Sequence, residues 1–221
     1  MSTSTFSPTT ARTDAGQARR TWASQLSAKY GEQGASRSLR RDALITGGWT
    51  LAATSVALFL ADHGMTYFST LGGAVTGLGI IAGLVATVAM CLMLLLSARV
   101  PVIDRTLGQD RALKLHSQLG KGMVYGLVMH GLLLVTGYAI TAKVNFVKMF
   151  ASLWPTGDFV LACLALLGMA IVGVTSVVAV RKKFPYEAWY AIHLTSYLAI
   201  AASVPHQFSM SGMLAEGTIG R

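Results

Sequence analysis

The stretch from His63 to Ala98, HGMTYFSTLGGAVTGLGIIAGLVATVAMCLMLLLSA, contains 36 residues without a single Asp, Glu, Lys or Arg. A helix that crosses a bilayer needs only about 20 predominantly apolar residues. This run therefore predicts a membrane-spanning helix. The whole chain agrees, because it is 53% hydrophobic and only 12% charged, about half the charged fraction of a soluble domain.

Other charge-free segments lie on both sides of this stretch: 43–61, 122–142, 159–180 and 188–215. Within lipid only helices and closed β-barrels satisfy the backbone, and no segment alternates with the strand period of two. We therefore predict an all-α polytopic membrane bundle with five transmembrane helices: 43–62, 71–97, 112–139, 159–180 and 187–205. Pro101 is expected to stop the second helix, and Pro185 is expected to start the fifth.

The distribution of basic residues predicts the orientation of this bundle. The formal net charge is +9, and fifteen of the 18 Lys and Arg residues lie in the N-terminal tail and in the two loops that follow the second and fourth helices. Only Lys143, Lys148 and Arg221 lie on the opposite side. The positive-inside rule therefore places the N-terminus in the cytoplasm and the C-terminus outside a plasma membrane. The charge predicts contact with anionic lipid and no nucleic-acid partner.

The residues outside the apolar segments suggest no second folded domain. Residues 1–41 read as a disordered basic cytoplasmic tail without a signal peptide, in which residues 19–39 are a weak candidate for an amphipathic helix. Cys91 and Cys163 fall within predicted helices and read as small apolar packing residues. His63, at the outer end of the first helix, reads as a polar interfacial residue.

The other four histidines form two pairs on two helices. His116 and His130 stand fourteen positions apart on the third helix, and His193 and His206 stand thirteen apart on the fifth. Because these two helices run in the same direction, the histidines lie at two matching depths about 20 Å apart. Gly120, on the same stripe as His116 and His130, is predicted to leave room for a large planar ligand.

The spacing is more favourable on the third helix than on the fifth. Fourteen residues bring His130 back to within about 40° of His116, whereas thirteen leave His206 about 140° from His193 in an ideal helix. Pro205 disfavours continued α conformation at the preceding residue. We therefore expect Pro205 to end or kink the fifth helix, which would let His206 turn back toward His130.

Two imidazoles at each depth limit the kinds of ligand or function that the histidines can serve. Zinc sites need three or four protein ligands, and a proton relay needs carboxylates that these helices lack. Haem iron takes two axial ligands, so the pattern predicts two b-type haems, one between His116 and His193 and one between His130 and His206. With both axial positions filled, electron transfer is expected, and no catalytic residue is predicted. Simple hydrogen bonding of each histidine to a neighbouring helix remains the alternative.

The sequence also resembles the ferric reductase-like transmembrane domain shared by ferric reductases, NADPH oxidases and bacterial relatives. The matching stretches are QDRALKLHSQLGKGMVYGLVMHG (109–131) and RKKFPYEAWYAIHLTSYLAIAASVPHQF (181–208). The resemblance implies a haem-binding domain over residues 42–208 with axial ligands His116, His130, His193 and His206. It implies the membrane component of an oxidoreductase that moves electrons from a cytoplasmic donor to an extracytoplasmic acceptor.

The family usually has a sixth helix, and many members carry a dehydrogenase domain that binds FAD and NAD(P)H. Residues 209–221 are therefore expected to be an extracytoplasmic segment truncated before a sixth helix. FAD and NAD(P)H would act only through a missing domain or a cytoplasmic partner subunit. A cofactor-free scaffold or transporter and a truncated inactive relative remain as alternatives, and ferric iron, oxygen and quinone all remain as acceptors.

Overall fold

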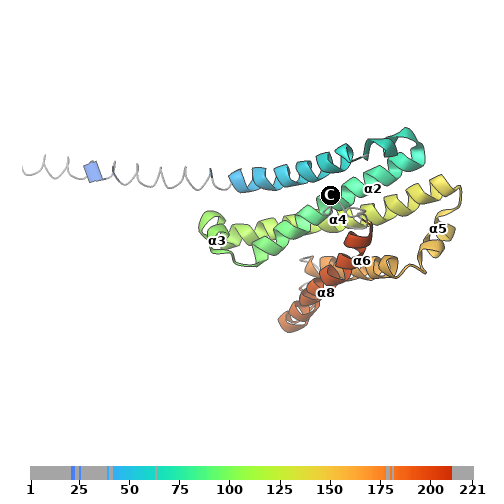
Figure 1. The fold of residues 1–221 in the computed structure, drawn as a ribbon. Coiled ribbons are helices and arrows are strands. Elements are labelled where there is room, and N and C mark those ends of the chain that lie inside the picture. The colour runs from blue at the N-terminus through green and yellow to red at the C-terminus, as the bar shows by residue number, and fades with distance from the viewer. Residues whose placement is uncertain are drawn as a thin grey trace, which may run out of the picture.

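The computed structural model describes residues 42–62, 64–177, 180 and 182–210, together with the isolated residues 21, 22, 25 and 39. This part of the chain is helical and contains no strand, which confirms the predicted all-α membrane bundle. Its elements, shown in Figure 1, are a first helix Asp42–Ala61, a 3-10 helix η1 (Gly64–Ser69), and the α-helices α2 (Leu71–Ser97), α3 (Pro101–Leu107), α4 (Gln109–Ala142), α5 (Phe146–Leu153), α6 (Gly157–Ser176) and α8 (Tyr186–Met210).

The predictions for the chain ends and for His63 lie outside the described residues. They concern most of residues 1–41, including nearly all of the candidate amphipathic segment 19–39, and the segment after residue 210.

Four of the described helices are long and apolar enough to cross a membrane, so the chain is a multi-pass membrane protein. They are the first helix, α2, α4 and α6, with mean hydropathies between 1.6 and 2.6. The fifth predicted span coincides with α8, which has 25 residues but is not among these apolar helices. Its histidines, a glutamate and several aromatic hydroxyl groups make it more polar than the other four. Four of the five predicted spans are therefore identified by length and composition among the described residues, and the fifth is present as a helix of lower hydropathy.

The prolines explain two helix boundaries. Pro185 directly precedes α8, as predicted, and its carbonyl oxygen accepts a hydrogen bond from the Trp189 N–H at 3.1 Å. Pro101 does not itself stop α2, which already ends at Ser97 and is followed by Arg99 in a left-handed conformation with φ 48°. Instead Pro101 occupies the first position of α3, where a proline costs no helical hydrogen bond.

The helices associate chiefly as two pairs. In the described part of the chain α2 packs along α4, and α6 packs along α8, while α4 also contacts α6 (Figure 1). Large apolar side chains such as Leu71, Tyr125 and Leu198 remain exposed on the outer faces of these helices. Such faces suit a lipid environment. Cys91 is also exposed, so the prediction that it is a packing residue is wrong, whereas Cys163 is partly buried.

Small residues allow α2 and α4 to approach each other closely. A Cβ atom built at Gly137 would lie 2.7 Å from the backbone nitrogen of Thr76, and one at Gly72 would lie 3.0 Å from that of Thr141. Inside a bilayer no hydrophobic driving force joins helices, so close backbone packing of this kind is a main source of their association. The glycines of α2 and α4 thus determine how the two helices fit together.

We expect Gly137→Ala to destabilise the α2–α4 pair by about 1–3 kcal/mol, the usual cost of overpacking. The added methyl group would meet backbone atoms of α2, which cannot move aside as a flexible side chain can. The melting temperature of the detergent-purified protein measures this effect. Gly122→Ala, on the same helix with no atom within 4 Å of its Cβ position, is the matched control. An equal melting temperature for the two variants would contradict the packing argument.

Candidate functional site

Helices α4 and α8 bring the four histidines together as two pairs. The ring centroids of His116 and His193 lie 6.2 Å apart with an interplanar angle of 56°. Those of His130 and His206 lie 6.4 Å apart with an angle of 71°. The two pairs proposed from the sequence are therefore neighbours in space.

Helix α8 does not end at Pro205. It continues through this residue to Met210, so the expected helix end is wrong, and His206 reaches His130 from within the helix. Figure 1 shows α8 running at a clear angle to α4. Because α8 is inclined to α4, His193 and His206 meet the two α4 histidines although they lie on different sides of α8.

Two main-chain carbonyl groups of α2 orient the histidines of α4. The Nδ1 atom of His116 lies 3.2 Å from the Met93 oxygen, and the Nδ1 atom of His130 lies 2.8 Å from the Gly79 oxygen. A carbonyl oxygen can only accept a hydrogen bond, so Nδ1 of each ring carries the proton. The lone pair is then on Nε2, which is the arrangement that metal-ligating histidines typically use.

The spacing of these carbonyls explains why one helix serves both rings. Gly79 and Met93 are fourteen residues apart on α2, as His116 and His130 are on α4, and the two hydrogen bonds pair the early residue of each helix with the late residue of the other. Both bonds are therefore formed by one antiparallel interface. Sequence reasoning missed them because main-chain carbonyls carry no residue-type signal.

A glycine of α2 makes room for the His130 ring. A Cβ atom at Gly83 would lie 2.5 Å from Nδ1 of His130 and 2.8 Å from its Cε1. The predicted role of Gly120 differs from what is found, because its Cβ position faces the Met93 side chain at 3.2 Å. Gly120 thus leaves space for the Met93 side chain of α2 and not for a ligand. Gly83, which has no signal in the sequence pattern, is the α2 glycine whose missing Cβ leaves space for a site residue.

Different groups surround His193. The Ser176 hydroxyl of α6 lies 3.2 Å from its Nδ1 atom. The Trp189 ring, one turn earlier on α8, stacks on the imidazole with centroids 5.2 Å apart and planes inclined by 26°. Tyr186, which is 60% exposed, contacts Trp189 in turn at a centroid distance of 6.0 Å. Helices α6 and α8 therefore orient this imidazole as α2 orients those of α4.

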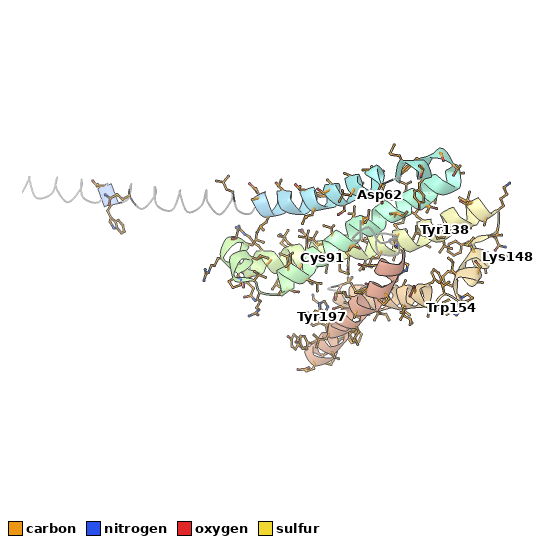
Figure 2. The ribbon with its side chains drawn as sticks, viewed as in Figure 1. Asp62, Cys91, Tyr138, Lys148, Trp154 and Tyr197 are labelled. Atoms are coloured by element: carbon orange, nitrogen blue, oxygen red, sulfur yellow. The ribbon has the colours of Figure 1, made fainter. Side chains whose placement is uncertain are left out.

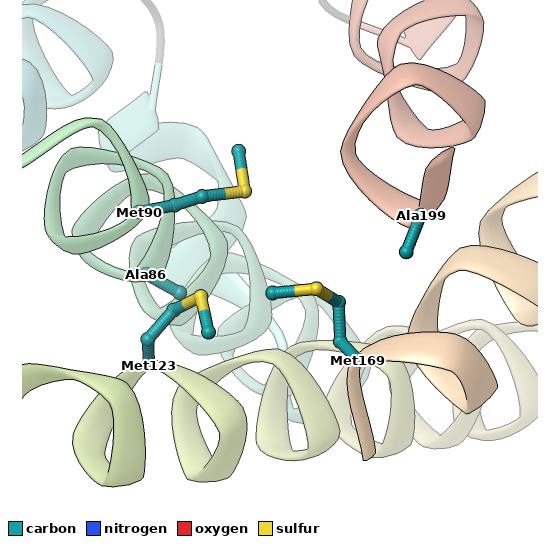
Figure 3. Packing of buried hydrophobic residues seen from close by; sticks show 5 residues of the cluster. All are labelled: Ala86, Met90, Met123, Met169 and Ala199. Atoms are coloured by element: carbon teal, nitrogen blue, oxygen red, sulfur yellow. The ribbon is translucent and has the colours of Figure 1, made fainter. Parts of the chain in front are cut away.

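An apolar layer separates the two histidine pairs. Met123 is seven residues from both His116 and His130, about 10 Å along the helix axis from each, and only 2% of it is exposed. It belongs to a cluster of residues from α2, α4, α6 and α8 (Figure 3): Ala86, Met90, Met123, Met169 and Ala199. The two pairs therefore form separate sites.

The residues near each pair do not form a larger metal site. Within the described ranges, no three His, Cys, Asp or Glu side chains gather closely enough to hold a metal ion. A structural zinc site, which needs four ligands, is thus not found there. A cofactor that takes one ligand from each of two helices fits the geometry better.

Comparison with known proteins identifies one family. The family model described as ferric reductase like transmembrane component matches residues 82–204, more than half of the chain. The match contains His116, His130 and His193 and ends two residues before His206. The search of curated proteins found no match for the chain.

Proposed function

Because the chain belongs to the ferric reductase-like transmembrane family, we propose that it transfers electrons across a membrane with two b-type haems, one at each histidine pair. The observation that carries this proposal is the separation of the rings. An imidazole nitrogen bonds a metal ion at about 2 Å, and the ring centre lies about 1 Å further away, so imidazoles on opposite sides of one ion stand about 6 Å apart. The observed 6.2 and 6.4 Å fit this value.

Each histidine has a role in this proposal. His116 and His193 would hold the inner haem, and His130 and His206 would hold the outer one. When bound, each haem supplies one-electron redox chemistry. The carbonyl oxygens of Met93 and Gly79 keep Nε2 of the α4 imidazoles unprotonated and available as a ligand. With two imidazoles available to each haem, the sites would favour electron transfer over binding of oxygen at iron.

The basic residues at the two ends of the helix bundle support one orientation of the chain in the membrane. The end of the bundle near the His116 pair carries Arg99, Arg105 and Arg111, whereas the opposite end of α4 carries Lys143 and, in α5, Lys148. By the positive-inside rule the inner pair faces the cytoplasm of a plasma membrane. In this arrangement α8 is the fifth span, with His193 and His206 directed toward the histidines of α4.

In this proposal residues 42–208 form the membrane component of an oxidoreductase. Electrons would come from a cytoplasmic dehydrogenase domain or subunit that binds FAD and NAD(P)H. The anionic lipids of the inner leaflet would contact the basic loops.

An absorption spectrum of the detergent-purified protein, oxidised and then reduced with dithionite, tests the proposal. We expect low-spin b-type bands, and a pyridine haemochrome count of about two haems per chain. One haem would mean that only one pair forms a site. A colourless protein from haem-replete cells would refute the proposal and would favour a cofactor-free scaffold, in which the histidines serve as hydrogen-bonding groups between helices.

A further inference from the structure

A pocket lined by hydroxyl groups lies where η1 meets the start of α2 and the end of α4. Its volume is about 280 Å³, close to the lower limit of small-molecule pockets, about 300 Å³. Its lining contains no charged side chain and consists of Thr66, Tyr67, Thr70, Gly73, Thr76, Tyr138 and Thr141. A site with six hydroxyl side chains and no charge suits a neutral ligand that forms hydrogen bonds.

The pocket adjoins the outer histidine pair. Thr76 lies one helical turn before Gly79, whose carbonyl oxygen is bonded to His130. Tyr138, labelled on α4 in Figure 2, follows His130 by eight residues, about 12 Å along the helix. The pocket thus begins about one turn beyond the outer pair, on the side away from the inner pair. In the proposed orientation it faces the extracytoplasmic boundary of the membrane.

Some of the pocket hydroxyls are engaged within their own helices. Thr76 donates to the Gly72 oxygen at 2.9 Å, and Thr141 donates to the Gly137 oxygen at 2.9 Å. The Thr70 oxygen accepts the Gly73 N–H at 3.1 Å, which leaves its own proton for a ligand.

The two phenols complete the set of donors. Tyr67 and Tyr138 are 39% and 36% exposed, and within the described part of the chain no hydrogen bond uses their hydroxyl groups. Thr70, Tyr67 and Tyr138 are therefore lining residues whose O–H groups donate to no other described residue, which leaves them available to a ligand.

We propose that this pocket binds a quinone, which accepts the electrons that cross the membrane. This inference rests on the proposed function. A quinone presents two carbonyl acceptors when oxidised and two hydroxyl donors when reduced. A side-chain hydroxyl both donates and accepts, so the same groups can bind both redox forms by rotating their protons. Quinones also dissolve in the bilayer and reach a pocket at its boundary.

The reaction balances without a further reagent. The quinone takes up two electrons, delivered one at a time by the proposed transmembrane transfer, and two protons from the extracytoplasmic water, and it leaves as the quinol. Two C=O groups become C–OH groups as the ring becomes aromatic, and no σ bond breaks.

The pocket is less suited to the other acceptors. A ferric chelate built from carboxylates is usually charged and needs cationic partners, which the lining lacks. Molecular oxygen is too small to contact three hydroxyl groups at once in a pocket of about 280 Å³.

Binding of tetramethyl-1,4-benzoquinone to the full chain in lipid nanodiscs tests the inference. Titration calorimetry is independent of haem, so it separates this site from the proposed function. We expect saturable binding that weakens about fivefold for Tyr67→Phe or Tyr138→Phe and about thirtyfold for the double variant, since one hydrogen bond contributes about 1 kcal/mol. Tyr125→Phe, at a side chain of α4 that is 72% exposed, is the control and should bind as the parent does.

A second measurement follows reoxidation of the dithionite-reduced protein by the same quinone in a stopped-flow instrument. We expect the double variant to reoxidise at least tenfold more slowly at low quinone concentration, with unchanged haem content. No saturable binding, or equal affinity for the parent and the double variant, would overturn the pocket assignment while leaving the haem proposal intact. A colourless protein that still binds quinone would overturn the acceptor role together with the proposed function.

Discussion

Replacing His193 with alanine is expected to lower the haem content from about two to about one per chain. Removal of one axial ligand leaves His116 alone on the opposite helix, and a single imidazole holds a six-coordinate low-spin haem poorly. The outer pair should persist, because its contacts come from Gly79, Gly83 and His206. A pyridine haemochrome count of the purified protein, normalised to chain concentration, measures the change.

The fifth histidine provides the control. His63→Ala removes an imidazole that belongs to neither pair, so it should leave both haems in place. His193→Met should retain a ligand and raise the midpoint potential of one haem, since methionine ligation has this effect. Full haem content and an unchanged spectrum for His193→Ala would show that His193 is not a ligand.

Much of this fold could be predicted from the amino-acid pattern alone. Charge-free runs determine where helices can cross lipid, and the limits predicted for the second helix, 71–97, agree with those of α2. The short elements η1, α3 and α5 were not predicted, because six to eight residues contain too few turns for a periodic signal. Their presence depends on local caps such as the Asn145 side chain, which accepts the Lys148 N–H at 2.8 Å.

The pairing of the histidines was also predictable, but their surroundings were not. Equal depth on two helices follows from spacing, since each residue adds about 1.5 Å. The partners of the Nδ1 atoms depend on which carbonyl of α2 lies opposite each ring, and this follows only from the three-dimensional packing. Ser176 likewise reaches His193 across the α6–α8 contact. The four histidines themselves stay predicted haem ligands, which a haem count on the purified protein would test.

Gly83→Ala is expected to disrupt the outer site while sparing the inner one. The new Cβ atom would lie 2.5 Å from Nδ1 of His130, so the imidazole must move away. It would then lose its 2.8 Å hydrogen bond to the Gly79 oxygen. Loss of such a supporting contact typically lowers metal affinity about 10- to 100-fold. The purified variant should therefore hold about one haem per chain, and haem titration should recover the outer site only at high concentration.

The matched control is Gly131→Ala, next to His130 on α4, where the nearest atom to the new Cβ is Leu166 Cδ2 at an ordinary 3.7 Å. This variant should keep both haems. A double-mutant cycle separates the local clash from general damage to the α2–α4 interface. In a His130→Ala background the imidazole is gone, so Gly83→Ala should lower the melting temperature and haem content no further. If Gly83→Ala costs as much in that background as in the parent chain, its effect comes from helix packing, and Gly83 does not act through His130.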